Sequence, residues 1–155
     1  MKKLFFLLSV VLFTFASCEG PPGRDGLDGR DGAGTYWFVK TYTIQSNQWT
    51  LINGEDQLNS YFRARISIPE LDRELYENGN VQCYMFQDVN NTEVQTPLPF
   101  TIPLGEAVGG GGEALWTETV SFDFYPGAIT FYVNYSDFFT SNRPGTISFR
   151  VVLTY

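Results

Sequence analysis

The 155-residue sequence contains no histidine and only two cysteines, Cys18 and Cys83. Histidine is the commonest general base in enzymes and the commonest metal ligand, so its absence removes the usual acid–base and metal-binding groups together. The Gly-rich run at residues 109–112 lacks the Lys-Ser/Thr ending of a phosphate-binding loop. We therefore expect neither an enzyme nor a cofactor or metal site.

Positive charge is also scarce. The chain has 10 Lys and Arg against 17 Asp and Glu, which gives a formal net charge of −7 at pH 7. A polyanion of this kind is a poor partner for nucleic acid or for an anionic lipid surface, because both carry negative charge themselves. We expect no nucleic-acid partner.

The sequence lacks an apolar run long enough to cross a membrane. Its longest run, residues 4–15, has 12 residues, whereas a membrane-spanning helix needs about 20. Lys2 and Lys3 precede this run and the small residues Ala16 and Ser17 follow it, which is typical of a signal peptide.

The four residues Phe15-Ala16-Ser17-Cys18 resemble the bacterial lipobox, in which an apolar residue and two small residues precede a cysteine. Phe15 stands where leucine is usual and keeps the apolar character. The resemblance implies that the Cys18 thiol receives diacylglycerol, that residues 1–17 are removed, and that the new amino group is acylated. More than one acyl chain makes such an anchor durable, since each buried methylene contributes about 0.8 kcal/mol. The alternative is an ordinary signal peptidase site that leaves Cys18 as a free thiol.

Residues 20–34 form five triplets that each begin with glycine, GPP GRD GLD GRD GAG. Glycine at every third position is the composition of collagen, because only glycine fits at the axis of three polyproline-II chains. Only the first triplet carries proline, and 15 residues span about 45 Å at most. The segment is therefore either a flexible spacer or, in a trimer, a short triple helix. Its acids Asp25, Asp28 and Asp31 lie about 9 Å apart in an extended chain, which is too far to share one calcium ion.

Residues 35–155 predict strands rather than helices. Short runs alternate apolar and polar residues, and they are rich in β-branched and aromatic side chains. The runs expected to be strands are residues 35–44, 48–52, 58–68, 81–86, 116–124, 129–135 and 146–155. We expect a tight hairpin turn at Pro126-Gly127 and, because of its prolines, only an edge strand near residues 97–104.

One helical pattern interrupts these strands, from Pro69 to Gly79. We expect at most two turns, with Pro69 at the first helical position and Gly79 as a left-handed stop. The glycines of residues 105–113 predict a mobile loop. The prediction is an all-β fold, an antiparallel β-sandwich or jelly-roll-like domain with one short helix, preceded by a signal peptide and an extended Gly-X-Y linker.

Two carboxylates suffice for glycosidase chemistry, and three acids could supply such a pair: Glu113, Glu118 and Asp123. Strand alternation places Glu118 on the face of Trp116 and Val120 and Asp123 on the other, so we do not expect these two to converge. Cys83 lies in an apolar strand and is expected to be an inert, unpaired thiol.

Aromatic side chains on the polar faces are the remaining candidates for binding. They are Trp37, Trp49, Tyr132, Phe138 and Phe139. These rings could stack on sugars or form an adhesive patch. The alternative is that loops or a neighbouring subunit cover them, as happens to many residues on the faces of a sandwich.

The order of lipobox cysteine, Gly-X-Y triplets and β-domain resembles collagen-like cell-envelope lipoproteins of Bacteroidetes-type bacteria. The resemblance implies a lipid-anchored location in the cell envelope, at the outer membrane, and supplies no activity. We expect a non-catalytic lipoprotein that displays its β-sandwich, residues 35–155, for structural or adhesive contact. A homotrimeric binding module for a glycan or protein ligand, with the layout of C1q-like trimers, is the alternative, and a glycan hydrolase is a more distant one.

Overall fold

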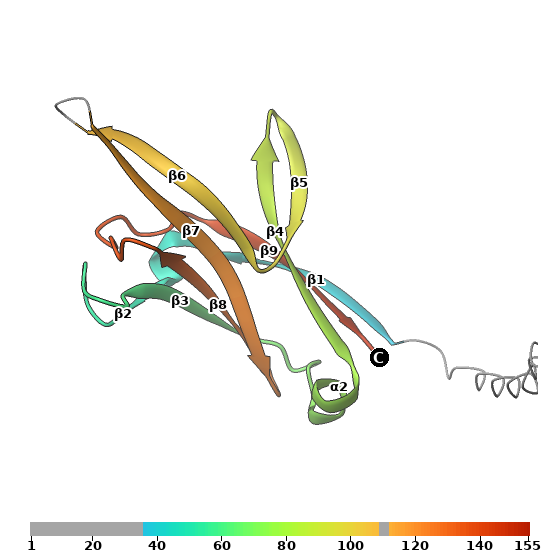
Figure 1. Cartoon of the computed structure of the whole chain (residues 1–155). Coiled ribbons are helices and arrows are strands. Elements are labelled where there is room, and N and C mark those ends of the chain that lie inside the picture. The colour runs from blue at the N-terminus through green and yellow to red at the C-terminus, as the bar shows by residue number, and fades with distance from the viewer. Residues whose placement is uncertain (1–35, 109–111) are drawn as a thin grey trace, which may run out of the picture. The chain divides into compact units, whose positions relative to one another are not determined.

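The computed structural model describes residues 36–108 and 112–155, which form two antiparallel sheets (Figure 1). The signal peptide, Cys18 and the Gly-X-Y linker lie outside the described residues. The four-stranded sheet has the order β1-β9-β4-β5, and the five-stranded sheet has the order β2-β3-β8-β7-β6. The strands are β1 (Trp37–Ile44), β2 (Thr50–Ile52), β3 (Tyr61–Ser67), β4 (Asn80–Val89), β5 (Thr92–Pro97), β6 (Phe100–Val108), β7 (Gly112–Tyr125), β8 (Ala128–Tyr135) and β9 (Ile147–Thr154). This is the predicted all-β sandwich.

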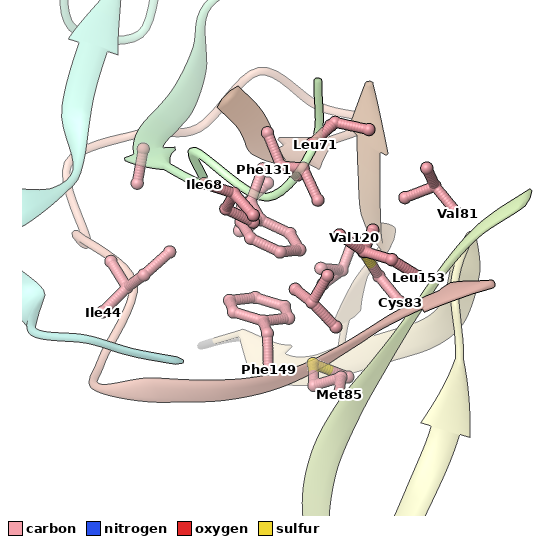
Figure 2. Close-up of a cluster of buried hydrophobic side chains, with 14 of the residues drawn as sticks. Ile44, Ile68, Leu71, Val81, Cys83, Met85, Val120, Phe131, Phe149 and Leu153 are labelled. Carbon is pink, nitrogen blue, oxygen red and sulfur yellow. The ribbon is translucent and has the colours of Figure 1, made fainter. Parts of the chain in front are cut away.

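The core lies between the two sheets and is aromatic at its centre. The rings of Phe131 on β8 and Phe149 on β9 stack with centroids 3.9 Å apart, and both side chains are fully buried (Figure 2). Trp49 meets Phe149 edge-on at 6.4 Å. One contiguous core therefore joins the two sheets, and all its members come from residues 44–153.

Alternation along the strands explains why these residues face each other. On β3, Phe62 and Ala64 are buried, whereas Arg63 and Arg65 between them are exposed, as expected for a half-buried strand. The last strand, β9, is predicted correctly in place and in face, and it lies between β1 and β4. Because β9 is a central strand, both of its edges are hydrogen-bonded.

The helical segment stays within the two turns expected but begins later than predicted. The helix α2 spans Arg73–Asn78, and Asp72 is its N-cap, with a side-chain oxygen that accepts a hydrogen bond from Leu75 N at 2.8 Å. The cap begins the helix later than the predicted start at Pro69, because a carboxylate satisfies a free N–H of the first turn. A 3-10 turn, η1 (Ser46–Gln48), is the other short helical element described. No helix of the described residues is long and apolar enough to cross a membrane.

The prediction of a left-handed stop at Gly79 is wrong. Its φ is −95° and its ψ is −173°, which is extended backbone. A Cβ atom at Gly79 would lie 2.7 Å from Leu75 O and 2.9 Å from Thr154 O. Glycine is needed there because two backbone carbonyls approach closely, not because of φ.

The loop expected at residues 105–113 is strand at residues 105–108 and 112–113, and residues 109–111 lie outside the described residues. Strand β6 continues to Val108 and β7 begins at Gly112, with Leu104 opposite Trp116 and Glu106 opposite Ala114. Cross-strand hydrogen bonds therefore override the low strand preference of glycine. The prediction of an edge strand is confirmed, because β6 is the last strand of its sheet and carries Pro103.

The predicted hairpin at Pro126-Gly127 is confirmed. Gly127 has a φ of 88°, in the left-handed region that favours glycine, and Tyr125 pairs with Ala128 across the turn. The Gly127 N–H donates to Leu71 O at 2.7 Å, and the Gly127 carbonyl accepts from Ile68 N at 2.9 Å. The turn is therefore fastened to the segment before α2.

Candidate binding groove

A groove of about 390 Å³ lies on the inward-facing side of the five-stranded sheet, along β6, β7 and the end of β8. In Figure 1 the β6–β7 hairpin and the β4–β5 hairpin end far from each other, so this part of the inner face reaches beyond the opposite sheet. We call it the acidic aromatic groove, and its lining is Leu104, Glu106, Ala114, Trp116, Glu118, Tyr135, Asp137, Phe139 and Asn142.

The floor of the groove continues the core face of the sheet. On β7, Trp116 and Glu118 lie on the same face as buried Val120, because side chains two residues apart share a face. Tyr135 stands opposite Glu118, and Leu104 stands opposite Trp116. Trp116, Glu118 and Tyr135 are half-buried, so the face changes from closed core to open groove along one strand pair.

The loop of residues 136–146 supplies the wall. Asp137, Phe139 and Asn142 all come from it, and 49% of Phe139 is exposed. The loop is tied to the floor where it leaves β8, since Thr117 N donates to Ser136 Oγ at 2.8 Å. Phe138 adopts a φ of 58°, a conformation that a bulky side chain rarely takes and that costs about 1–3 kcal/mol. The surrounding hydrogen bonds must hold this conformation.

Asp56 is the main anchor of that loop. Its carboxylate accepts hydrogen bonds from the Ser141 hydroxyl at 2.7 Å, from Ser141 N at 3.0 Å and from Thr140 N, while Asp56 N donates to Thr140 Oγ1 at 2.9 Å. The Ser141 hydroxyl, followed by the Thr140 N–H, lowers the pKa of Asp56 below its usual range. The ionised carboxylate is therefore the form that fastens the loop.

Trp49 is a second anchor and corrects a prediction. It is 1% exposed and packs in the core, whereas the sequence placed it among the candidate binding aromatics. Its Nε1 donates to Gly145 O at 3.1 Å, and Arg143 Nη1 donates to Trp49 O at 2.6 Å. Trp49 looks like a surface residue in sequence because Gln48 and Thr50 beside it are polar. Only the folded loop covers it.

The other four predicted aromatics do not gather at one site. Phe139 lines the groove, and its neighbour Phe138 is half-buried. Trp37 is 65% exposed on β1 of the four-stranded sheet. Tyr132 lies on the opposite face of β8 from the groove, where its hydroxyl donates to Asp123 Oδ2 at 2.7 Å. A single adhesive patch of these residues is therefore not formed.

The charge of the groove is negative. Its lining holds Glu106, Glu118 and Asp137 and no Lys or Arg. Burial, followed by the charge of Glu118, raises the pKa of the Tyr135 phenol far above its usual value. Tyr135 therefore stays a neutral hydrogen-bond donor beside the Glu118 carboxylate at any physiological pH.

Glu118 and Asp123 lie on opposite faces of β7, as expected. Of the three candidate acids, only Glu118 lines the groove, whereas Asp123 bonds Tyr132 on the outer face and Glu113 is exposed on that same face of β7. Sequence patterns did not indicate Glu106, Trp116, Tyr135 or Asp137 as binding residues. Leu104, Glu106, Ala114 and Trp116 do alternate in register about the Gly-rich turn, and this pattern could have indicated a hairpin with a common face.

Cys83 is buried at 2% exposure, and its burial raises the pKa of the thiol to about 12. It has no disulfide partner among the described residues. The described residues also contain no group of three or more side chains able to hold a metal ion.

The chain matches no protein-family model, no curated protein and no solved structure.

Proposed function

We propose that this protein is a lipid-anchored cell-envelope protein whose β-sandwich is a non-catalytic adhesive domain, and that the acidic aromatic groove binds a glycan. The observation that carries the proposal is the groove itself, in which Trp116, Tyr135 and Phe139 stand among carboxylates at the uncovered end of the inner face. The membrane anchor would be the lipid on Cys18.

The size and lining of the groove favour a small polar ligand with flat apolar surfaces. Binding sites of this kind have volumes of about 300–1,000 Å³, aromatic walls and a few placed polar groups. The groove has about 390 Å³, three aromatic side chains, and the polar groups of Glu118 and Asn142. A sugar ring offers a C–H face that packs on Trp116 and hydroxyls that donate to carboxylates.

The spacing of Glu106 and Glu118 favours binding over hydrolysis. Glu118 on β7 pairs with Ile102 on β6, and Glu106 is four residues further along β6, so the backbone positions of the two acids lie about 13 Å apart. Catalytic carboxylates of glycosidases lie about 5–10 Å apart. A glycan hydrolase is the second candidate, because, after burial, the charges of two carboxylates, Glu118 and Asp137, both raise the pKa of the Tyr135 phenol.

The test is calorimetry of the full chain in a non-ionic detergent with neutral gluco-, manno-, xylo- and N-acetylglucosamine hexamers. We expect at least one hexamer to bind, and Trp116→Ala to weaken binding about tenfold, since one stacking contact is worth about 1–2 kcal/mol. Trp37→Ala is the matched control, because Trp37 is exposed on the other sheet. Binding neither of any hexamer in this panel nor of glucosamine hexamer, or equal binding by both variants, would overturn the proposal.

The same samples test the hydrolase. After prolonged incubation with the hexamer that binds, we expect no new reducing ends. Release of shorter oligosaccharides that Glu118→Gln and Asp137→Asn abolish, and that Glu113→Gln leaves unchanged, would replace adhesion with hydrolysis as the function.

A further inference from the structure

We infer that the groove selects glycans that carry free amino groups, the protonated amine being held by its carboxylates against the aromatic faces. The inference rests on the proposed function and names the chemical class of its ligand. It follows from the charge of the elements that build the groove, and from the positions of the nearest cations.

The fold places no basic side chain among the residues that line the groove. Strands β6, β7 and β8 and the loop of residues 136–146 together contain one basic residue, Arg143. Arg143 Nη1 donates a hydrogen bond to Trp49 O at 2.6 Å, and Arg143 does not line the groove. The arginines of the adjacent strand β3, Arg63 and Arg65, lie on the outer face, where Arg65 stacks on Tyr125 at 4.9 Å. The groove acids therefore have no basic side chain among the lining residues.

Three like charges along one groove repel one another, and a bound cation relieves that repulsion. An anionic sugar such as a uronic acid or a sulfated residue would add to it. A neutral hydroxyl can donate to a carboxylate but cannot neutralise it, whereas an ammonium group does both.

The aromatic walls favour the same ligand. The face of an aromatic ring carries negative potential and attracts an ammonium group placed within about 6 Å of it. Trp116, the ring type that binds cations best, lies one position along the strand face from Glu118. A ligand that presents a C–H face and an amine on the same ring uses both features together.

The experiment compares two hexamers with the same sugar backbone, glucosamine hexamer with free amino groups and N-acetylglucosamine hexamer with neutral amides, each titrated by calorimetry into the full chain in non-ionic detergent at mildly acidic pH. We expect the amine form to bind at least tenfold more tightly. We also expect its affinity to fall about threefold or more between about 50 mM and about 500 mM salt, since salt screens charges over about 4–14 Å in this range.

Two charge-matched variants distinguish the contribution of the groove carboxylates to binding from the contribution of the net charge of the protein. The triple variant Glu106→Gln, Glu118→Gln, Asp137→Asn should lose about tenfold or more in affinity for the amine hexamer, at about two- to fivefold for each exposed pair. The control Asp88→Asn, Glu93→Gln, Glu113→Gln removes the same charge from exposed residues outside the groove and should change affinity less than twofold. Circular dichroism confirms that both are folded.

Equal binding of the two hexamers, lost in Trp116→Ala, would overturn the preference for amines and leave glycan binding standing. Binding of neither hexamer would overturn the inference, and the neutral panel above then decides the proposed function separately. Equal losses in the two triple variants would overturn it as well, because attraction would then come from net charge. Binding of a lysine hexamer but of neither sugar would assign the groove to a protein partner and overturn both.

Discussion

Replacing Trp49 tests the structure, because the loss of a core side chain lowers stability, whereas the loss of a surface ligand-binding side chain lowers only binding. The side chain is 1% exposed, it packs edge-on against Phe149, and its indole N–H donates to Gly145 O. Replacing Trp49 with alanine removes a large buried side chain and leaves a cavity, which costs about 3–5 kcal/mol. Trp49→Phe keeps most of the volume and loses the hydrogen bond, so its cost should be about 1–2 kcal/mol.

The assay is urea unfolding followed by far-ultraviolet circular dichroism. With an m-value of about 1–3 kcal/mol per molar urea, Trp49→Ala should lower the midpoint by about 2 M, with the slope unchanged. A domain of this size has about 5–15 kcal/mol of stability, so Trp49→Phe keeps the test readable if Trp49→Ala is unfolded. Trp37→Ala, at an exposed position, should change the free energy of unfolding by less than about 0.5 kcal/mol.

The refuting result is equally specific. If Trp49→Ala were as stable as the unsubstituted protein and lost glycan binding, Trp49 would be a surface ligand residue, and the packing of the loop of residues 136–146 described above would be wrong. The structure predicts the reverse order of effects: a large loss of stability for Trp49→Ala and a small one for Trp116→Ala.

Three further predictions concern the Asp56 carboxylate that fastens the loop of residues 136–146, the Cys83 thiol and the oligomeric state. Because the folded state lowers the pKa of Asp56, its carboxylate stabilises the fold above the ordinary aspartate pKa of about 3.9, and this contribution is lost as the pH falls through the folded-state pKa. Asp56→Asn should therefore destabilise the protein at pH 7 and progressively less on acidification, as measured by thermal unfolding at several pH values. An equal effect at every pH would contradict the role of Asp56 as the anchor of the loop. With a pKa of about 12, Cys83 should react with a thiol reagent at pH 8 only after unfolding, and rapid labelling of the folded protein would refute its burial. Light scattering of residues 19–155, with and without residues 19–34, should give a monomer in both cases. The reason is that the large exposed apolar side chains, such as Leu58 and Leu115, are scattered over separate elements. A trimer in both cases would make the trimeric binding module the better proposal.

Local patterns in the sequence were sufficient for most of the fold. The faces of β3, β8 and β9 follow from alternation alone, because a half-buried strand needs one apolar side. The hairpin at Gly127 follows from a dipeptide whose backbone preferences match the turn. The predictions failed where distant backbone decided the outcome, as at Gly79, whose missing Cβ makes room for Thr154 O from the end of the chain.

What the sequence determined by itself is chemistry that depends on which residues are present: no histidine, an excess of acids, a lipobox-like cysteine and strand-forming periodicity. The groove was decided by tertiary structure alone. Glu106, Trp116 and Asp137 come from three different elements, and nothing local to any of them shows that the opposite sheet leaves this end of the inner face uncovered. The same holds for Trp49, which has polar neighbours in sequence and becomes a core residue only because a loop almost 100 residues later folds over it. Burial is a property of the whole packed chain, so a local pattern can indicate which face of a strand is apolar but not which part of that face remains open to a ligand.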